Sequence, residues 1–265
     1  MKICDTAIVH PKAEISDGVE VGQYSYIGEH VKIGKNTKIY PSVVIDGWTT
    51  VGENNKIFPG VVIGMDPQDL RYKGEQTEVV IGDDNIIREH VTIHRATPGG
   101  TASSDGARAV TIVGNHNYLM AHCHVAHNCK IWNEVVICNS VELAGYVEVE
   151  DGATLGGIIG VHQFTRIGKW TMVGGFTRVV KDIPPFIKVE GQPARPFGLN
   201  NVGLKRRGVG AERRLELKRA CRILYQDGNN LTQAIQKIRT ELTQTEEILY
   251  LLNFLEHPSR MGILI

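Results

Sequence analysis

Five side chains that could bind a metal or move a proton lie close together in the stretch MAHCHVAHNC, at positions 120–129. They are three histidines and two cysteines: His122, Cys123, His124, His127 and Cys129. Imidazole and thiolate groups are the usual ligands of zinc. A single imidazole, with an ordinary pKa of about 6.5, can instead take a proton from a hydroxyl group. Their chemistry alone therefore leaves a metal centre and a general base both open.

The cysteines support a metal site only weakly. Their number is odd, five, and no two of them form the CxxC pair that is typical of a zinc site. A chain of 265 residues can bury enough apolar surface to fold without disulfides. We therefore expect reduced thiols at Cys4, Cys123, Cys129, Cys138 and Cys221.

Composition indicates a globular chain without a general affinity for nucleic acid. Hydrophobic residues make up 42% of it, and 29 Lys and Arg residues balance 29 Asp and Glu residues, so no overall basic field attracts phosphates. No window approaches the roughly 18 apolar residues of a membrane span, and the first residues lack the apolar stretch of a signal peptide. The expectation is a cytoplasmic protein that neither binds nucleic acid nor inserts into a membrane.

An aliphatic residue recurs at every sixth position through most of the first 180 residues. A period of six fits neither a 3.6-residue helix nor a two-faced strand. It fits short strands separated by turns, each sending one aliphatic side chain inward. The series has 25 members: Val9, Ile15, Val21, Ile27, Ile33, Ile39, Ile45, Val51, Ile57, Ile63, Ile81, Ile87, Ile93, Val113, Leu119, Val125, Ile131, Ile137, Leu143, Val149, Leu155, Val161, Ile167, Val173 and Val179.

This pattern resembles that of the hexapeptide-repeat transferases, whose fold is a left-handed parallel β-helix with three strands per coil. The resemblance implies 18 residues per coil, with coils stacked about 4.8 Å apart. Two polar segments interrupt the period, at positions 65–78 and 95–108, and are expected to be loops on a continuing prism. The prolines of KDIPPF are expected to end the repeat.

A different composition follows the repeat. Positions 211–228, 229–242 and 245–257 carry apolar residues at helical spacing and predict three helices. We therefore expect a mainly β protein in two parts, a β-helix over residues 1–190 and a helical appendage over residues 191–265. The appendage would cover the open end of the prism, where strand groups otherwise lack partners.

Eighteen residues per coil also predicts which polar residues lie near His127. One and two coils further on are Gly145 and Gln163, with Tyr146 and His162 as their immediate neighbours. We therefore expect these five residues along one corner of the prism, in three adjacent coils that span roughly 10 Å.

A zinc site is the alternative interpretation of the same stretch. His122 and His127 have the HxxxxH spacing of the γ-class carbonic anhydrases, a zinc-dependent family with the same kind of prism. The third histidine of that family lies about two coils earlier, where this chain has Ile86. Cys123 and Cys129 fall at small-residue positions, two before an inward aliphatic, where packing explains them. A third ligand is therefore missing, and we expect no metal.

Five short motifs follow one another on the prism and after it: HVAHNC, LAGY, GVHQF, DIPPF and GLNNVGLKRRG. With PQDLRYKGE and IREHVTIHRAT, this ordered set resembles the UDP-N-acetylglucosamine O-acyltransferases of lipid A synthesis over nearly the whole chain. The resemblance implies transfer of a 3-hydroxyacyl chain from acyl carrier protein to the glucosamine 3-hydroxyl of UDP-N-acetylglucosamine. It also implies a homotrimer with sites between subunits, and no cofactor.

The resemblance assigns roles to the residues that match its motifs. His127 would be the general base, and Gly145 would donate its backbone N–H to the oxyanion of the tetrahedral intermediate. The loop with Asp69 and Arg71 would reach a neighbouring subunit, and Gly175 would leave room for the acyl tail. The residues implied in substrate binding are Asp69, Arg71, His124, Tyr146, His162, Gln163, Gly175, Asn200, Arg206 and Arg207. Among them, Gln163, Asn200, Arg206 and Arg207 would hold the nucleotide.

Four positions depart from the pattern of this family. Asn128 follows the base where Asp is common, Tyr146 replaces a histidine, Val202 replaces an acidic residue, and Pro193 stands where a polar residue is frequent. Two questions stay open at this point. The acceptor could carry a 3-amino group in place of the 3-hydroxyl, and the chain could be a different hexapeptide acyl- or acetyltransferase.

Acyl carrier proteins are acidic as a class, so a basic surface is expected on this partner. The appendage supplies basic residues for such a surface, although solvated helix charge explains several of them equally well. They are Lys205, Arg206, Arg207, Arg213, Arg214, Lys218 and Arg219.

Overall fold

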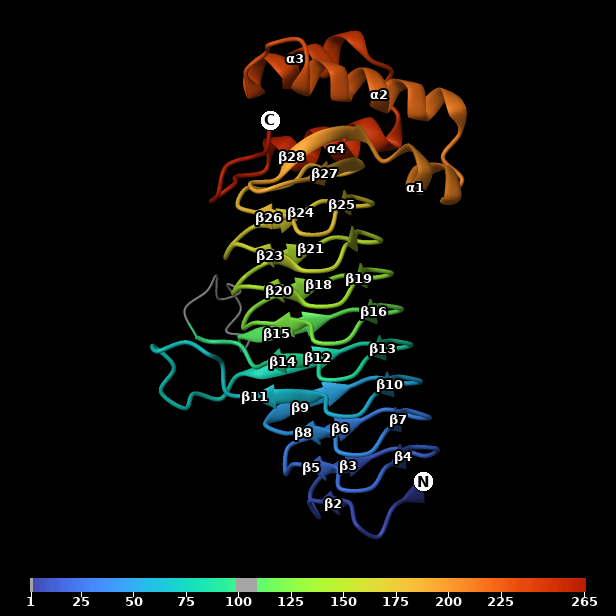
Figure 1. Cartoon of the computed structure of the whole chain (residues 1–265), viewed down its shortest axis with the longest axis vertical. Helices are drawn as coiled ribbons and strands as arrows, with labels where there is room; N and C mark the ends of the chain where they lie inside the picture. The colour runs from blue at the N-terminus through green and yellow to red at the C-terminus, as the bar shows by residue number, and fades with distance from the viewer. Residues whose placement is uncertain (1, 99–108) are drawn as a thin grey trace.

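The computed structural model describes residues 2–98 and 109–265 and has the form of a long three-sided prism (Figure 1). Each face is a parallel β-sheet, and each coil of the chain adds one strand to each face. The chain winds as a left-handed β-helix, and the helices lie at its C-terminal end. The predicted fold class is confirmed.

We name the three faces sheets A, B and C. Sheet A has the order β1 (Lys2–Ile3), β4 (Glu20–Val21), β7 (Lys38–Ile39), β10 (Lys56–Ile57), β13 (Ile86–Ile87), β16 (Tyr118–Leu119), β19 (Val136–Ile137), β22 (Thr154–Leu155), β25 (Met172–Val173), β27 (Ile187–Glu190) and β28 (Arg195–Leu199). Sheet B contains β2 (Ile8–Val9), β5 (Tyr26–Ile27), β8 (Val44–Ile45), β11 (Val62–Met65), β14 (Thr92–His94), β17 (His124–Val125), β20 (Val141–Leu143), β23 (Ile159–Val161) and β26 (Arg178–Val179). Sheet C contains β3 (Glu14–Ile15), β6 (Lys32–Ile33), β9 (Trp48–Val51), β12 (Glu78–Ile81), β15 (Val110–Val113), β18 (Lys130–Ile131), β21 (Glu148–Val149) and β24 (Arg166–Ile167).

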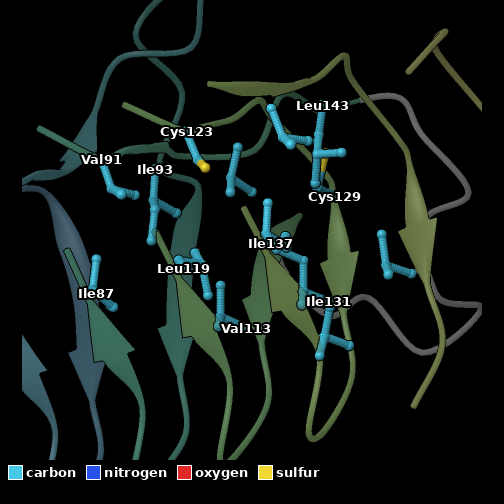
Figure 2. Packing of buried hydrophobic residues seen from close by; sticks show 14 of the residues in the cluster. Ile87, Val91, Ile93, Val113, Leu119, Cys123, Cys129, Ile131, Ile137 and Leu143 are labelled. Carbon is cyan, nitrogen blue, oxygen red and sulfur yellow. The ribbon is translucent and has the colours of Figure 1, made fainter. Parts of the chain in front are cut away.

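The hexad aliphatics form the core of the prism. Val9 and Ile15, at the open N-terminal end, are partly exposed, and every other member of the series is at most 3% exposed. Figure 2 shows these side chains pointing from all three sheets toward the axis, with the sulfurs of Cys123 and Cys129 among them. The prediction that one aliphatic per strand faces inward is confirmed.

The register confirms the 18-residue coil and locates the two insertions. Lys130 pairs with Glu148, and Glu148 pairs with Arg166, each 18 positions on. At the insertions, β11 pairs with β14 and β14 pairs with β17, so the prism continues past each loop. Of the second predicted loop, positions 99–108 lie outside the described residues.

Glycines that follow the inward aliphatic serve close packing between coils. A Cβ on Gly22 would lie 2.6 Å from the backbone nitrogen of Pro41, and one on Gly34 would lie 2.6 Å from the oxygen of Gly52. Left-handed backbone falls mainly on other residues at the corners, such as Asn36 (φ 56°) and Tyr146 (φ 61°). The glycines after the inward aliphatic residues are therefore explained more by the close spacing of neighbouring coils than by turn conformation.

The prism extends beyond the prolines that were expected to end it. Strand β27 pairs in parallel with β25, and β28 returns antiparallel to β27, so sheet A gains two strands after Pro184 and Pro185. Both prolines lie in the turn before β27, where no ladder hydrogen bond is needed from their nitrogens. The prediction that the ladder stops at these prolines was wrong.

Four helices follow: α1 (Asn201–Arg206), α2 (Ala211–Tyr225), α3 (Leu231–Glu241) and α4 (Glu246–Glu256). The last three match the predicted helices, and the short α1 was not predicted. The helices share a hydrophobic core that also includes Phe186. Tyr250 of α4 connects this core to the prism, because its hydroxyl donates a hydrogen bond to Glu150. Within the described residues, none of the helices combines the length and apolarity needed to cross a membrane.

Candidate active site

The three edges of the prism carry different chemistry. We call the edge between sheets B and C the BC corner, and it holds residues 126–129, 144–147 and 162–165 of successive coils. The edge between A and B is the AB corner, and the edge between C and A is the CA corner. Backbone hydrogen bonds from Tyr146 to His127 and from Phe164 to Gly145 join the three coils at the BC corner. The predicted stacking of these positions is confirmed.

His127 lies directly over Gly145. Its side chain is only 10% exposed, and a Cβ built on Gly145 would lie 2.6 Å from the His127 Nε2. Within residues 2–98 and 109–265, the Gly145 N–H donates no hydrogen bond to another part of the chain. The site therefore offers a ring nitrogen and a free backbone donor side by side, and glycine is required because any side chain would meet the imidazole.

Two neighbouring side chains lie within hydrogen-bond distance of the His127 Nδ1. Its Nδ1 lies 2.9 Å from the Asn128 Oδ1 and 3.3 Å from the hydroxyl of Thr97. The Nε2 has neither of these partners, and the Asp69 Oδ2 lies 3.9 Å from it. This geometry leaves Nε2 available to interact with a substrate.

The loop between β11 and β12 brings Asp69 and Arg71 to the BC corner of the same chain. Arg71 donates to Asp69 from Nε, from its terminal nitrogen and from the backbone, at 3.1, 2.8 and 3.0 Å. These bonds lower the pKa of Asp69 to about 2, so it is a carboxylate at neutral pH. A contact of this loop with a neighbouring subunit stays a prediction.

An aromatic stack extends the BC corner away from the base. The Tyr146 ring packs edge-on against His127, with centroids 5.3 Å apart, and stacks on Phe164 at 4.8 Å. Arg260, from the C-terminal segment, lies 3.5 Å from the Phe164 centroid. The Tyr146 hydroxyl is 3.2 Å from that of Thr97, so its polar atom already has a partner within the chain.

His124 occupies the outer face of sheet B next to the base. Its Nδ1 is 2.7 Å from the Thr92 hydroxyl, and its ring packs edge-on against His94. Burial lowers the pKa of His124 to about 4 and also lowers that of His94. Both rings are therefore neutral at physiological pH and can act as hydrogen-bond donors or acceptors without adding charge.

A cavity of about 680 Å³ opens on sheet B beside the BC corner. It brings together five of the predicted residues: His124, His127, Gly145, His162 and Gln163. Residues that were not predicted also line it: Gln68, Glu142, Gly160 and Arg178. A second cavity of about 510 Å³ lies on the sheet C side, where Arg71 and Tyr146 are among the lining residues.

Gly175 lies at a different edge. It is an exposed residue of the AB corner, where a Cβ would lie 3.2 Å from the Gly157 oxygen and within 4 Å of no atom of His127. Sheet B separates the two corners, so a chain bound at His127 would have to cross that face to reach Gly175. A role for Gly175 in acyl length stays a prediction.

Of the four residues expected at the nucleotide, Gln163 lines the cavity beside His127, and Asn200, Arg206 and Arg207 lie at the CA corner. The Asn200 side chain donates to the Trp170 carbonyl and caps α1, while Arg207 binds Glu134 and the Gly152 carbonyl. Arg206 is exposed and has no ion-pair partner within the described part of the chain. One copy of the chain therefore does not bring these three CA-corner residues to His127, and Figure 1 shows α1 and the loop after β11 on opposite sides of the prism.

The remaining histidines and cysteines of the first stretch are explained by packing. Burial raises the pKa of Cys123 to about 11 and that of Cys129 to about 12, so both are thiols. His122 stacks on His90 at the AB corner, with centroids 5.1 Å apart. In residues 2–98 and 109–265, no group of three or more His, Cys, Asp or Glu side chains is placed to hold a metal ion.

Thr97 contacts the base, and the sequence analysis did not single it out. It falls inside the second interruption of the repeat, where counting in steps of 18 no longer relates it to position 128. Two features of the sequence could have drawn attention to it: it ends the motif IREHVTIHRAT, and it lies in a long loop. The structure brings it into contact with His127, Asn128 and Tyr146.

Comparisons with known proteins show the family of the chain. A family model described as UDP N-acetylglucosamine O-acyltransferase, domain 2, matches residues 182–264, and a model of six bacterial transferase hexapeptides matches residues 30–64. Curated acyl-(acyl-carrier-protein)–UDP-N-acetylglucosamine O-acyltransferases are similar over almost their whole length. That of Thermodesulfovibrio yellowstonii is 49% identical over 98% of each chain, and that of Thiobacillus denitrificans is 48% identical over 96% of each.

Solved structures give the same result. The UDP-N-acetylglucosamine O-acyltransferase of Moraxella catarrhalis is 35% identical, with a TM-score of 0.93 and 100% of each chain covered. A UDP-N-acetylglucosamine acyltransferase of Bacteroides fragilis is 40% identical, with a TM-score of 0.93 and 99% of each chain covered. With identity at this level over nearly the full length, the chain belongs to the acyl-(acyl-carrier-protein)–UDP-N-acetylglucosamine O-acyltransferase family.

Proposed function

We propose that this protein transfers a 3-hydroxyacyl chain from acyl carrier protein to the glucosamine 3-hydroxyl of UDP-N-acetylglucosamine, as the first step of lipid A synthesis. The observation that carries the proposal is the placement of the His127 imidazole over Gly145 at the edge of a cavity of about 680 Å³. Within the described residues, the Gly145 N–H donates no hydrogen bond and is left for a substrate. The names of the curated relatives support this reaction over a zinc-dependent hydrolase or another hexapeptide transferase.

The chemistry of the step follows from these two groups. The His127 Nε2 takes the proton of the sugar 3-hydroxyl as its oxygen attacks the thioester carbonyl, a role worth about 10²- to 10⁴-fold in rate. The Gly145 N–H donates to the oxyanion of the tetrahedral intermediate. When the C–S bond breaks, the imidazolium returns the proton to the leaving thiolate. The step uses no cofactor.

The active form is proposed to be a homotrimer, because one chain holds only part of the site. The base and Gly145 lie at the BC corner, whereas Asn200, Arg206 and Arg207 lie at the CA corner. Cyclic assembly would bring the BC corner of one copy to the CA corner of the next. Guanidinium groups suit the oxygens of a diphosphate, so Arg206 is proposed to meet the nucleotide across this interface.

Acyl carrier protein is proposed to dock on the helical appendage. Three of the basic residues expected there are already paired with carboxylates, namely Arg207, Arg213 and Arg219. Within the described residues, Lys205, Arg206 and Lys218 have no such partner, and Lys218 lines a cavity of about 670 Å³ between β28 and α2. We also propose that the chain divides at residue 190 into a β-helix and a helical part, and that the protein is cytoplasmic.

The direct test is an acyl-transfer assay with UDP-N-acetylglucosamine and a panel of 3-hydroxyacyl carrier proteins. We expect the wild type to acylate the sugar nucleotide with at least one donor, and we expect His127→Ala to lose at least about 100-fold in kcat. His10→Ala, far from the site near the N-terminal end, is the matched control and should keep full activity. Absence of transfer to any sugar nucleotide would reject the function, and retention of more than about a tenth of the activity by His127→Ala would reject the base.

A further inference from the structure

The amide of Asn128 is held in one orientation by Thr97. The Asn128 Nδ2 donates to the Thr97 carbonyl at 3.1 Å, and the Asn128 Oδ1 accepts from the Thr97 N–H at 2.9 Å and from its hydroxyl at 3.0 Å. Turning the amide over would place its NH₂ against the Thr97 N–H and its oxygen against the Thr97 carbonyl. Both contacts would be repulsive, so the oxygen must be the atom that faces His127.

The backbone of Asn128 is anchored as well. Its N–H donates to the Thr111 hydroxyl at 2.9 Å, and its φ of 61° is in the left-handed region that asparagine tolerates. Thr97 lies in the first residues of the second insertion and Thr111 follows it, so residues from both ends of that loop hold Asn128. The position of the amide therefore depends on the loop as well as on the corner.

An oxygen fixed in this way selects the protonation of the imidazole. The Asn128 Oδ1 can only accept, so the His127 Nδ1 at 2.9 Å must carry the hydrogen. The Nε2 then holds the lone pair and faces the Gly145 side of the site. We propose that Thr97 and Asn128 are positioning residues that hold His127 in the form protonated on Nδ1 by means of a neutral amide in place of a carboxylate. The proposal rests on the proposed function for its effect on rate, but its structural part does not.

The carboxylate close to His127 lies on the Nε2 side of the ring and not at Nδ1. Asp69 approaches the Nε2 side and is itself bound to Arg71. The charge of a protonated His127 lowers the pKa of the nearby His94 and His124, whose pKa values burial lowers most, and the Tyr146 phenol packs against the His127 ring. A carboxylate introduced at position 128 would therefore be a new charge at Nδ1 and not an addition to an existing one.

The first experiment observes the protonation directly. A long-range ¹H–¹⁵N correlation spectrum of protein labelled with ¹⁵N-histidine distinguishes the two neutral forms, and His127→Gln identifies the signals of His127. We expect the wild type to carry the proton on Nδ1. In Asn128→Gly, which keeps the left-handed backbone without strain, we expect the form protonated on Nε2 to appear. Asn36→Gly, the same change in a left-handed corner residue of another coil, is the matched control and should leave the His127 signals unchanged.

The second experiment measures the consequence for the reaction. Asn128→Gly should lower kcat by about tenfold or more, within the contribution of about 10²- to 10⁴-fold that a general base makes, with KM within about twofold of wild type. Asn128→Asp should keep the proton on Nδ1 and stabilise the imidazolium, so the acid limb of the kcat/KM profile should move up by about one pH unit. Thr97→Val should lower kcat, and Thr97→Ser should restore it.

The outcomes separate this proposal from the proposed function. If the wild type transfers no acyl chain but shows His127 protonated on Nδ1, only the function is rejected. If the wild type is active and Asn128→Gly keeps both the Nδ1 form and full kcat, the positioning role is rejected. An acid limb that does not move in Asn128→Asp would reject the claim that the orienting group at this position is neutral in the wild type.

Discussion

At the scale of single residues, the site depends on one glycine as much as on the histidine. The imidazole of His127 covers Gly145 so closely that the space of a methyl group is already filled. The same closeness places the Gly145 N–H next to the nitrogen that would take the proton, which suits an intermediate that forms between the two. Position 145 is thus constrained by both space and chemistry.

Gly145→Ala should therefore inactivate the enzyme without unfolding it. The new methyl group would displace the imidazole, and a shift of about 1 Å in a reacting group can cost about 100-fold in rate. We expect a loss of that order in kcat with an unchanged thermal midpoint, measured by the transfer assay and by calorimetry. Gly210→Ala, where a Cβ meets no atom within 4 Å, is the control. Full activity of Gly145→Ala would show that the base does not act from the position seen in the structure.

The residues of this corner could be predicted to different degrees. Gly145 and Gln163 follow from His127 by the 18-residue coil, because no insertion lies between them. Thr97 could not be found in that way, since the second loop breaks the count between it and Asn128. Arg206 and Arg207 were assigned by motif alone, and motifs do not show at which edge of the prism a residue lies.

At the scale of elements, a ladder of asparagines explains how the coils keep register at the CA corner. Asn55, Asn85 and Asn117 precede β10, β13 and β16 and are buried. The Asn85 amide donates to the Asn55 Oδ1 and to the Gly114 carbonyl, and its oxygen accepts from the Asn117 backbone. The last two bonds connect coils between which the second loop is inserted. Asparagine after the aliphatic could be predicted as a turn residue, but its role inside the prism could not.

Asn85→Ala should accordingly destabilise the prism where the loops leave it. The change removes three buried hydrogen bonds and leaves the Asn117 N–H without its acceptor, which corresponds to about 2–4 kcal/mol of unfolding free energy. The measurement is the denaturation midpoint at fixed protein concentration. Asn253→Ala, an exposed helical position, is the matched control and should change the midpoint little. Equal midpoints for both variants would contradict a structural role for the ladder.

At the scale of the whole molecule, the separation of the BC and CA corners predicts that each active site contains residues of two chains. If each site takes His127 from one chain and Arg206 from the next, two inactive variants can restore each other. A trimer that contains both His127→Ala and Arg206→Ala chains always has one position where an intact His127 meets an intact Arg206 of the following chain. A site contained in a single chain could not be restored in this way.

The test is co-expression of the two variants under different affinity tags, with purification of trimers that carry both. We expect such mixed trimers to show about one third of wild-type kcat, because one of three sites is intact. The matched control pairs His127→Ala with Gly145→Ala. Both changes lie at the BC corner of the same chain, so every site of a mixed trimer would have either a missing or a displaced imidazole. Recovery with the first pair and none with the second would place the nucleotide contact of Arg206 on the neighbouring chain, whereas no recovery with the first pair would reject a shared site.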